Sequence, residues 1–175
     1  MKIVRDYQFV AESYKGATAA IGNFDGVHSG HQAVIDIARN AAPHAPLGVV
    51  TFEPHPRAYF APGAPPFRLM NAKARATRLE KLGVDVLYQL NFNRQLAELT
   101  PEGFAKHVLA EGLGLTHVVV GSDFCFGKAR SGTVDHLIAF GETFGFGVTV
   151  AELVASPSGA VSSTAIRTAL SEGRP

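Results

Sequence analysis

The chain of 175 residues contains one cysteine and no tryptophan, and it lacks long hydrophobic runs. Cys125 cannot form an internal disulfide, and without a second cysteine nearby it is a poor start for a zinc site. No apolar stretch is long enough to span a bilayer, and the opening residues MKIVRDYQFV lack the apolar run and cleavage site of a signal peptide. We therefore expect no membrane contact and a cytoplasmic location.

An excess of charge of one sign is also missing. The 16 basic and 15 acidic residues leave a formal net charge of +1, without the long basic runs of a general nucleic-acid binder. We therefore expect small-molecule substrates and no nucleic acid as partners. With 46% hydrophobic and 18% charged residues, the chain can bury one sizeable core, so we expect a single domain over residues 1–175.

Strand-like apolar runs alternate with helix-like segments. The runs begin at residues 18, 47, 84, 116 and 147. This alternation predicts an α/β fold, a Rossmann-like doubly wound parallel sheet with helices on both faces, and the stretch before Thr18 is predicted to add an edge element. A strand order of 3-2-1-4-5 would place the loops at 22–31 and 121–132 side by side, at the switch point where such sheets bind ligands.

Two helices follow from local patterns. Thr100, Pro101 and Glu102 form an ordinary helix start, with Thr as cap and Pro in the first turn. Residues 72–82 keep one apolar face, formed by Ala76, Leu79 and Leu82. We interpret the basic residues of this segment as a solvated face: Lys73, Arg75, Arg78 and Lys81.

The sequence GNFDGVHSGH at 22–31 predicts an anion site. Its glycines lie in a strand-to-helix turn, where the unpaired N–H groups of the first helical turn face an anion. His28 and His31, three residues apart, would add two donors to phosphate oxygens. The alternative is one solvated and one packing histidine.

Three further segments are candidates for the same site. The segment PHPRAYFAPGAPP at 54–66 holds five of the 10 prolines, cannot be a regular helix or central strand, and is either a wall or lid over the site or a simple connector. In the loop 121–132, Phe124 and Phe126 could fill the core or stack on a ligand, and Lys128 and Arg130 could contact phosphate or solvent. In SSTAIR at 162–167, the hydroxyl groups are predicted to cap a short helix, with Arg167 one turn in.

The HxGH element resembles that of the nucleotidyltransferase superfamily. Four blocks in order, GNFDGVHSGH, FEPHPRAYF, GSDFCFGKARSG and SSTAIR, resemble the FMN adenylyltransferase module of bacterial bifunctional riboflavin kinase/FAD synthetases. The resemblance implies transfer of AMP from ATP to FMN, giving FAD and pyrophosphate. The catalytic residues it implies are His28, His31 and Arg167. The ATP-binding residues it implies are Gly22, Asn23, Phe24, Gly30, Ser163 and Thr164. The flavin-binding residues it implies are Asp25, His55, Arg57, Tyr59, Asp123, Phe124 and Phe126.

The expected chemistry is in-line attack of the FMN phosphate on the α-phosphorus of ATP. A phosphate monoester is already largely anionic near neutral pH, since its second pKa is about 6, so no strong base is needed. Positioning and charge stabilisation should dominate. Mg²⁺ is expected to bind through the ATP phosphates and water, with Asp25 and Asp123 as outer contacts and no direct protein ligand assigned.

Several alternatives remain. The enzymes of the resembled family continue into a riboflavin kinase domain, which is absent from residues 1–175, so we expect no flavokinase activity. Other interpretations are a sister adenylyltransferase for pantetheine phosphate or a nicotinate nucleotide, a fragment of a class I aminoacyl-tRNA synthetase, or a nucleotide-binding module that has lost its chemistry. Against the synthetase interpretation, the sequence lacks a lysine-rich KMSKS-like loop.

Overall fold

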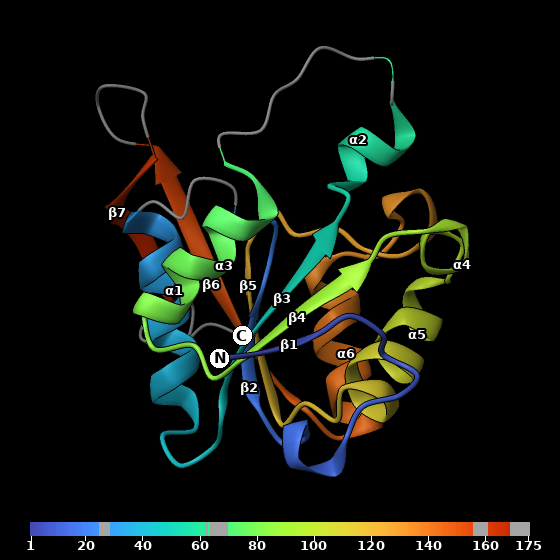
Figure 1. The fold of residues 1–175 in the computed structure, drawn as a ribbon, viewed down its shortest axis with the longest axis horizontal. Coiled ribbons are helices and arrows are strands. Elements are labelled where there is room, and N and C mark those ends of the chain that lie inside the picture. The colour runs from blue at the N-terminus through green and yellow to red at the C-terminus, as the bar shows by residue number, and fades with distance from the viewer. Residues whose placement is uncertain (25–28, 62, 64–69, 156–160, 169–175) are drawn as a thin grey trace.

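The fold is built on a seven-stranded sheet in the order β1-β4-β3-β2-β5-β6-β7 (Figure 1). The computed structural model describes residues 1–24, 29–61, 63, 70–155 and 161–168, with the backbone alone for 29–30, 152–155 and 161–168. The strands are β1 (Lys2–Val4), β2 (Thr18–Ile21), β3 (Leu47–Glu53), β4 (Val86–Asn91), β5 (His117–Gly121), β6 (Gly147–Ala155) and β7 (Val161–Thr168). All neighbours pair in parallel except β6 and β7.

The predicted doubly wound order is confirmed. Starting from β2, the five predicted strands lie in the order 3-2-1-4-5, and β1 is the expected additional edge element, paired with β4. The pairing of Ala20 with Val119 in β2 and β5 brings the first and fourth of these strands together. The loops that follow them therefore leave the same edge of the sheet.

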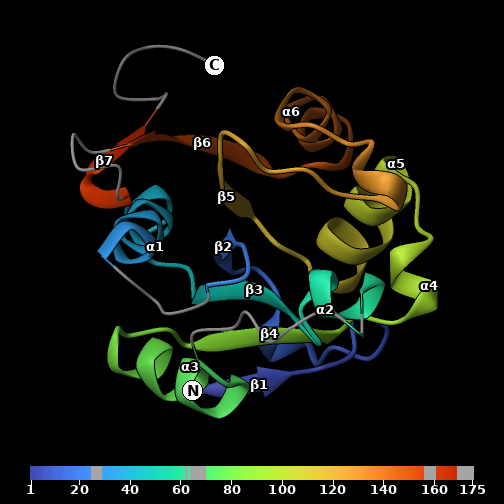
Figure 2. The same cartoon turned by 90° about the horizontal axis from the view of Figure 1, so that it is seen from above.

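Helices cover both faces of the sheet (Figure 2). One face carries α1 (Ser29–Ala41) and α3 (Ala72–Lys81). The other carries α4 (Arg94–Ala97), α5 (Pro101–Gly103), the π-helical η2 (Phe104–Gly112) and α6 (Val134–Phe144). The remaining helices are α2 (Pro56–Phe60) and the 3-10 turns η1 (Glu12–Tyr14) and η3 (Lys128–Arg130). Among the described residues, no helix is long and apolar enough to cross a membrane.

Strand periodicity divides the core into two layers. In β3, Val50 and Phe52 pack with residues of η2 and α6, whereas Val49, the residue before Val50, packs with residues of α1 and α3. Successive strand residues point to opposite faces, and a parallel sheet covered on both sides needs apolar residues on each. Burial on both faces therefore explains the continuous apolar runs in the sequence.

The predicted helix start at Thr100 is confirmed. The Thr100 side chain accepts a hydrogen bond from the backbone N–H of Gly103 at 3.0 Å, and Pro101 occupies the first helical position. The helix continues directly into η2, where Phe104, Val108 and Leu109 are buried.

Three sequence-based expectations are wrong. Residues Pro56–Phe60 form a short helix, α2, because Pro56 stands at its first position, where a missing N–H costs nothing. Residues 162–164 do not precede a helix: they lie in β7, which pairs antiparallel with β6. Arg75 is not part of a solvated face but is 1% exposed. The partners of its guanidinium explain this burial and are described below.

Candidate active site

The loops after β2 and β5 begin at the same carboxyl edge of these neighbouring parallel strands. Gly22, directly after β2, donates its backbone N–H to the carbonyl of Val50 at 3.0 Å, and Ser122, directly after β5, donates to the carbonyl of Ala151 at 2.8 Å. Each loop thus leaves the sheet while still bonded to a neighbouring strand. The strands that precede the two sequence blocks predicted to meet at the switch point, β2 and β5, are neighbours in the sheet.

The backbone of the first loop is anchored from two other elements. The carbonyl oxygen of Asn23 accepts hydrogen bonds from Thr51 Oγ1 of β3 at 3.2 Å and from Arg75 Nη1 of α3 at 3.1 Å. The Asn23 side-chain oxygen Oδ1 is buried and has no hydrogen-bond partner among the described residues. Such an acceptor is suited to a ligand N–H or O–H group or to water.

Phe24 adopts a left-handed backbone conformation, with φ of 52°, which is uncommon for a large side chain. Its ring is only 3% exposed and lies against the His31 imidazole in the first turn of α1, at 5.1 Å between ring centroids. The turn therefore places the His31 ring beside a buried aromatic wall. Gly30 lies in the same turn of α1, whereas Asp25 and His28 lie outside the described residues.

In the segment after β3, a helix cap and aromatic packing hold the side chains of His55 and Tyr59 in place. His55 is the N-cap of α2, and its Nδ1 accepts a hydrogen bond from the backbone N–H of Arg57 at 3.0 Å. Tyr59 packs edge-on against Phe60 and Phe92, at 5.1 and 5.3 Å between ring centroids. Since Phe92 directly follows β4, these contacts hold α2 at the carboxyl edge of the sheet. The Arg57 side chain is exposed.

In the second loop, the phenyl rings point inward and the charged groups outward. Phe124 and Phe126 are stacked at 5.6 Å with 14° between ring planes, and Phe126 also contacts Phe104 in the core. Asp123, Lys128 and Arg130 are exposed. The core-filling alternative therefore holds for Phe126.

The carboxyl-terminal block reaches the site as a strand. Ser163, Thr164 and Arg167 lie in β7, where the backbone of Arg167 pairs with that of Glu152. Both views show β7 beside α1, the helix that follows the first loop (Figures 1 and 2). The structure thus brings the backbone of this block next to the helix that carries His31.

Sequence reasoning missed an ion pair between the buried Arg75 and the partly exposed Glu53. Arg75 Nη2 lies 2.9 Å from Glu53 Oε2 at the end of β3. Arg75, Leu79 and Leu82 are spaced four and three residues apart, as positions on one helix face are, so the spacing could have placed Arg75 among the buried positions.

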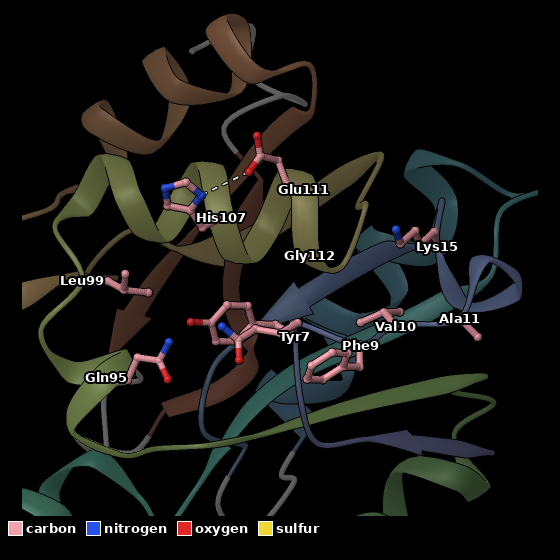
Figure 3. Close-up of a pocket in the computed structure, with 11 residues that line it drawn as sticks. Tyr7, Phe9, Val10, Ala11, Lys15, Gln95, Leu99, His107, Glu111 and Gly112 are labelled. Atoms are coloured by element: carbon pink, nitrogen blue, oxygen red, sulfur yellow. Dashed lines mark hydrogen bonds and ion pairs between the residues drawn. The ribbon is translucent and has the colours of Figure 1, made fainter.

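A separate groove of about 800 Å³ lies away from these loops, between the connection from β1 to β2 and the helices α4 and η2 (Figure 3). Tyr7, Phe9, Lys15 and Gln95 line it, and the pair of His107 and Glu111, 3.1 Å apart, lies at its rim. Burial, and to a lesser extent the charge of Asp6, raises the pKa of Tyr7 above its ordinary value. None of the predicted site residues lines this groove.

No group of three histidine, cysteine, aspartate or glutamate side chains able to hold a metal ion occurs within the described part of the chain.

The parallel sheet, with a glycine-rich turn leading into a histidine-bearing helix at its switch point, defines a nucleotidyltransferase-like α/β protein. The sequence pattern of one family, described as FAD synthetase, matches residues 10–165. The chain belongs to the FAD synthetase family.

Curated relatives share most of this chain. A protein of Pseudomonas fluorescens is 42% identical over 172 residues, which cover 97% of this chain and 55% of the relative. One of Escherichia coli K12 is 33% identical over 175 residues, covering 98% and 56%. Both are named bifunctional riboflavin kinase/FMN adenylyltransferase. The chain spans about half the length of the curated relatives it matches.

Solved structures support the same fold. A crystal structure named as a macrolide-efflux protein of Streptococcus pneumoniae has a TM-score of 0.73 and 26% identity, covering 93% of this chain and 53% of that one. A pantothenate synthetase of Thermus thermophilus has a TM-score of 0.57 and 17% identity, covering 92% and 65%. The second likeness concerns the fold alone.

Proposed function

We propose that this chain transfers AMP from ATP to FMN, giving FAD and pyrophosphate. The observation that carries the proposal is the adjacency of β2 and β5, the strands that precede the two loops, with the Phe24 ring against His31 at the switch point. The names of the relatives, all of which include FMN adenylyltransferase activity, supply the substrates.

The reaction is a single displacement at phosphorus. An FMN phosphate oxygen forms a bond to the α-phosphorus of ATP while the bond from this phosphorus to the bridging oxygen breaks, and that oxygen leaves with pyrophosphate. We assign the triphosphate to the first turn of α1, which carries His31, with His28 and the guanidinium of Arg167 as further donors to its oxygens. Gly22, Asn23, Phe24, Gly30, Ser163 and Thr164 complete the ATP side.

We place the flavin at the same carboxyl edge of the sheet, next to the proposed ATP-binding residues. The capped turn of His55, the exposed guanidinium of Arg57 and the ring of Tyr59 form one wall. We assign Asp123 and Phe124 to the other wall, together with Asp25, and Phe126 stacks on Phe124. Aromatic rings and a cation suit an isoalloxazine ring with a phosphate-bearing chain.

ATP enters as its magnesium complex. The oxygen-rich phosphates and water supply the ligands that Mg²⁺ prefers, and we assign Asp25 and Asp123 as outer contacts of the ion. When bound, the ion offsets charge on the phosphates.

We assign the FMN adenylyltransferase activity in the relatives' names to the part of those proteins that this chain matches, and the riboflavin kinase activity to the remainder of those proteins.

The test is chromatographic. The purified chain is incubated with ATP and FMN, with and without Mg²⁺, and in parallel with riboflavin, with pantetheine phosphate and with nicotinate mononucleotide. We expect FAD and pyrophosphate from FMN only when Mg²⁺ is present, and no FMN from riboflavin. Product from another acceptor in place of FMN would reassign the substrate, and ATP binding without any product would identify a nucleotide-binding module.

A further inference from the structure

The guanidinium of Arg75 bonds at once to the loop after β2 and to the last residue of β3. Its Nη1 donates to the backbone carbonyl of Asn23 at 3.1 Å, in the loop proposed to bind ATP. Its Nη2 donates to Glu53 Oε2 at 2.9 Å, and Glu53 is the last residue of β3, directly before the Pro54 to Pro56 turn on the flavin side. One planar group therefore links the starts of two segments that lie far apart in the sequence.

The arrangement follows from strand periodicity. Thr51 and Glu53 lie two residues apart in β3 and so point to the same face, which α3 covers. Thr51 is buried and donates to the same Asn23 carbonyl as Arg75, at 3.2 Å. The carbonyl thus receives two donors, one from β3 and one from α3.

The Arg75 side chain is only 1% exposed, so we assign it no direct contact with a substrate. Its effect on chemistry must pass through the backbone that it holds. Asn23 is followed by Phe24, with φ of 52°, whose buried ring packs on His31. Fixing the Asn23 carbonyl therefore fixes the turn that sets the Phe24 ring against His31.

We propose that Arg75 is a positioning residue. Through Asn23 and Glu53, it fixes the loop after β2, on the proposed ATP side, relative to the segment after β3, on the proposed flavin side. The inference rests on the proposed adenylyl transfer for its kinetic consequence, but not for its structural one. In-line attack depends on the relative placement of two bound substrates, so a shift between the loops lowers the rate of the chemical step more than it weakens either substrate's binding.

The central comparison is between Arg75→Met and Arg78→Met. Both substitutions remove an arginine from α3, but Arg78 is exposed. For Arg75→Met we expect kcat for FAD formation to fall about 30-fold, with KM for ATP and for FMN changed less than about threefold. Arg78→Met should match the wild type. A wild-type kcat in Arg75→Met, or a rise in KM with kcat unchanged, would overturn the positioning role.

A second measurement does not depend on turnover. Amide hydrogen exchange over residues 22–24 reports whether the loop is held, and we expect it to accelerate in Arg75→Met and to stay unchanged in Arg78→Met. Unchanged exchange in a folded Arg75→Met variant would overturn the tether. If the wild type makes no FAD, the proposed function fails, while the exchange result still decides whether Arg75 holds the loop.

Two further variants keep the test decisive if Arg75→Met does not fold. Arg75→Lys keeps the charge, but a single ammonium group cannot span both acceptors as the guanidinium fork does, so exchange at 22–24 should accelerate and kcat should fall. Glu53→Gln leaves the bond from Arg75 to Asn23 in place, so exchange at 22–24 should stay close to wild type. Equal exchange rates in Arg75→Lys and Glu53→Gln would contradict the two-sided tether.

Discussion

The Phe24 ring and the His31 imidazole lie 5.1 Å apart between centroids, with 59° between their planes. A tilted contact of this kind is favourable for aromatic pairs and restricts the rotation of the histidine ring. Because Phe24 is buried and its backbone is left-handed, the position of His31 depends on the shape of the turn that precedes its helix.

We therefore expect Phe24→Leu to lower FAD synthesis out of proportion to its effect on stability. The substitution removes the ring contact with His31 but keeps an apolar side chain, so the cost in stability should be about 1 to 1.5 kcal/mol. Phe146→Leu, which alters another buried phenylalanine away from the site, is the matched control. Thermal unfolding and steady-state rates of both variants are compared. Equal rates of FAD synthesis in the two variants would show that Phe24 has no specific role in the reaction.

Replacement of the proposed phosphate contacts should abolish most turnover. We expect His28→Ala and Arg167→Ala each to lower kcat by about 100-fold or more, because each removes a donor to developing phosphate charge. His44→Ala and Arg94→Ala, at exposed positions, control for the loss of a histidine and of an arginine. Melting temperatures near the wild-type value would show that the lost activity is not lost folding, whereas unchanged rates would remove these residues from the mechanism.

Tyr59→Ala should act on the flavin side. The side chain packs on Phe92 and borders the proposed flavin wall, so its removal should raise the KM for FMN by about tenfold while the KM for ATP stays near wild type. Initial rates at varied FMN and varied ATP separate the two effects. A rise in the KM for both substrates would contradict a specific role in flavin binding and would indicate that Tyr59 stabilises the site as a whole.

Gly127 is predicted to be intolerant of a side chain. It has φ of 77°, and a Cβ there would lie 2.7 Å from the backbone nitrogen of Pro101. Gly127→Ala should therefore destabilise the fold by roughly 2 to 4 kcal/mol, from strain and a backbone clash together. Gly145→Ala is the control: φ is 94°, but no atom lies within 4 Å, so only strain of about 1 kcal/mol is expected. Denaturant unfolding compares the two.

Acidification should destabilise the protein through His117. Burial lowers the pKa of His117 below its ordinary value of 6.5, so the unfolded chain binds a proton before the folded one as pH falls through that value. The free energy of unfolding therefore decreases as the pH falls from 6.5 to the lower pKa of His117 in the folded protein. Unfolding between about pH 7.5 and 5 should show a smaller loss for His117→Gln than for wild type. Thr149→Val removes the 2.7 Å hydrogen-bond partner of His117 but leaves the imidazole buried, so it should keep the pH dependence.

The sequence by itself determined the strand order of the sheet and which two loops follow its neighbouring strands β2 and β5. Alternating apolar runs and helical segments predict the strand order around β2, because right-handed crossovers leave few ways to wind such a chain. The glycine-rich turn and the helix after it follow from local chemistry, as does the cap at Thr100.

Tertiary structure alone decided the rest. The run VSSTAIRT carries hydroxyls that suit a helix cap and β-branched residues that suit a strand, and the open edge of β6 decides in favour of β7. Arg75 stands among exposed cations in its helix, and only the fold brings it to Glu53 and to the Asn23 carbonyl. These partners lie 22 and 52 residues away in the chain, and no local pattern encodes a charge pair formed at such a distance.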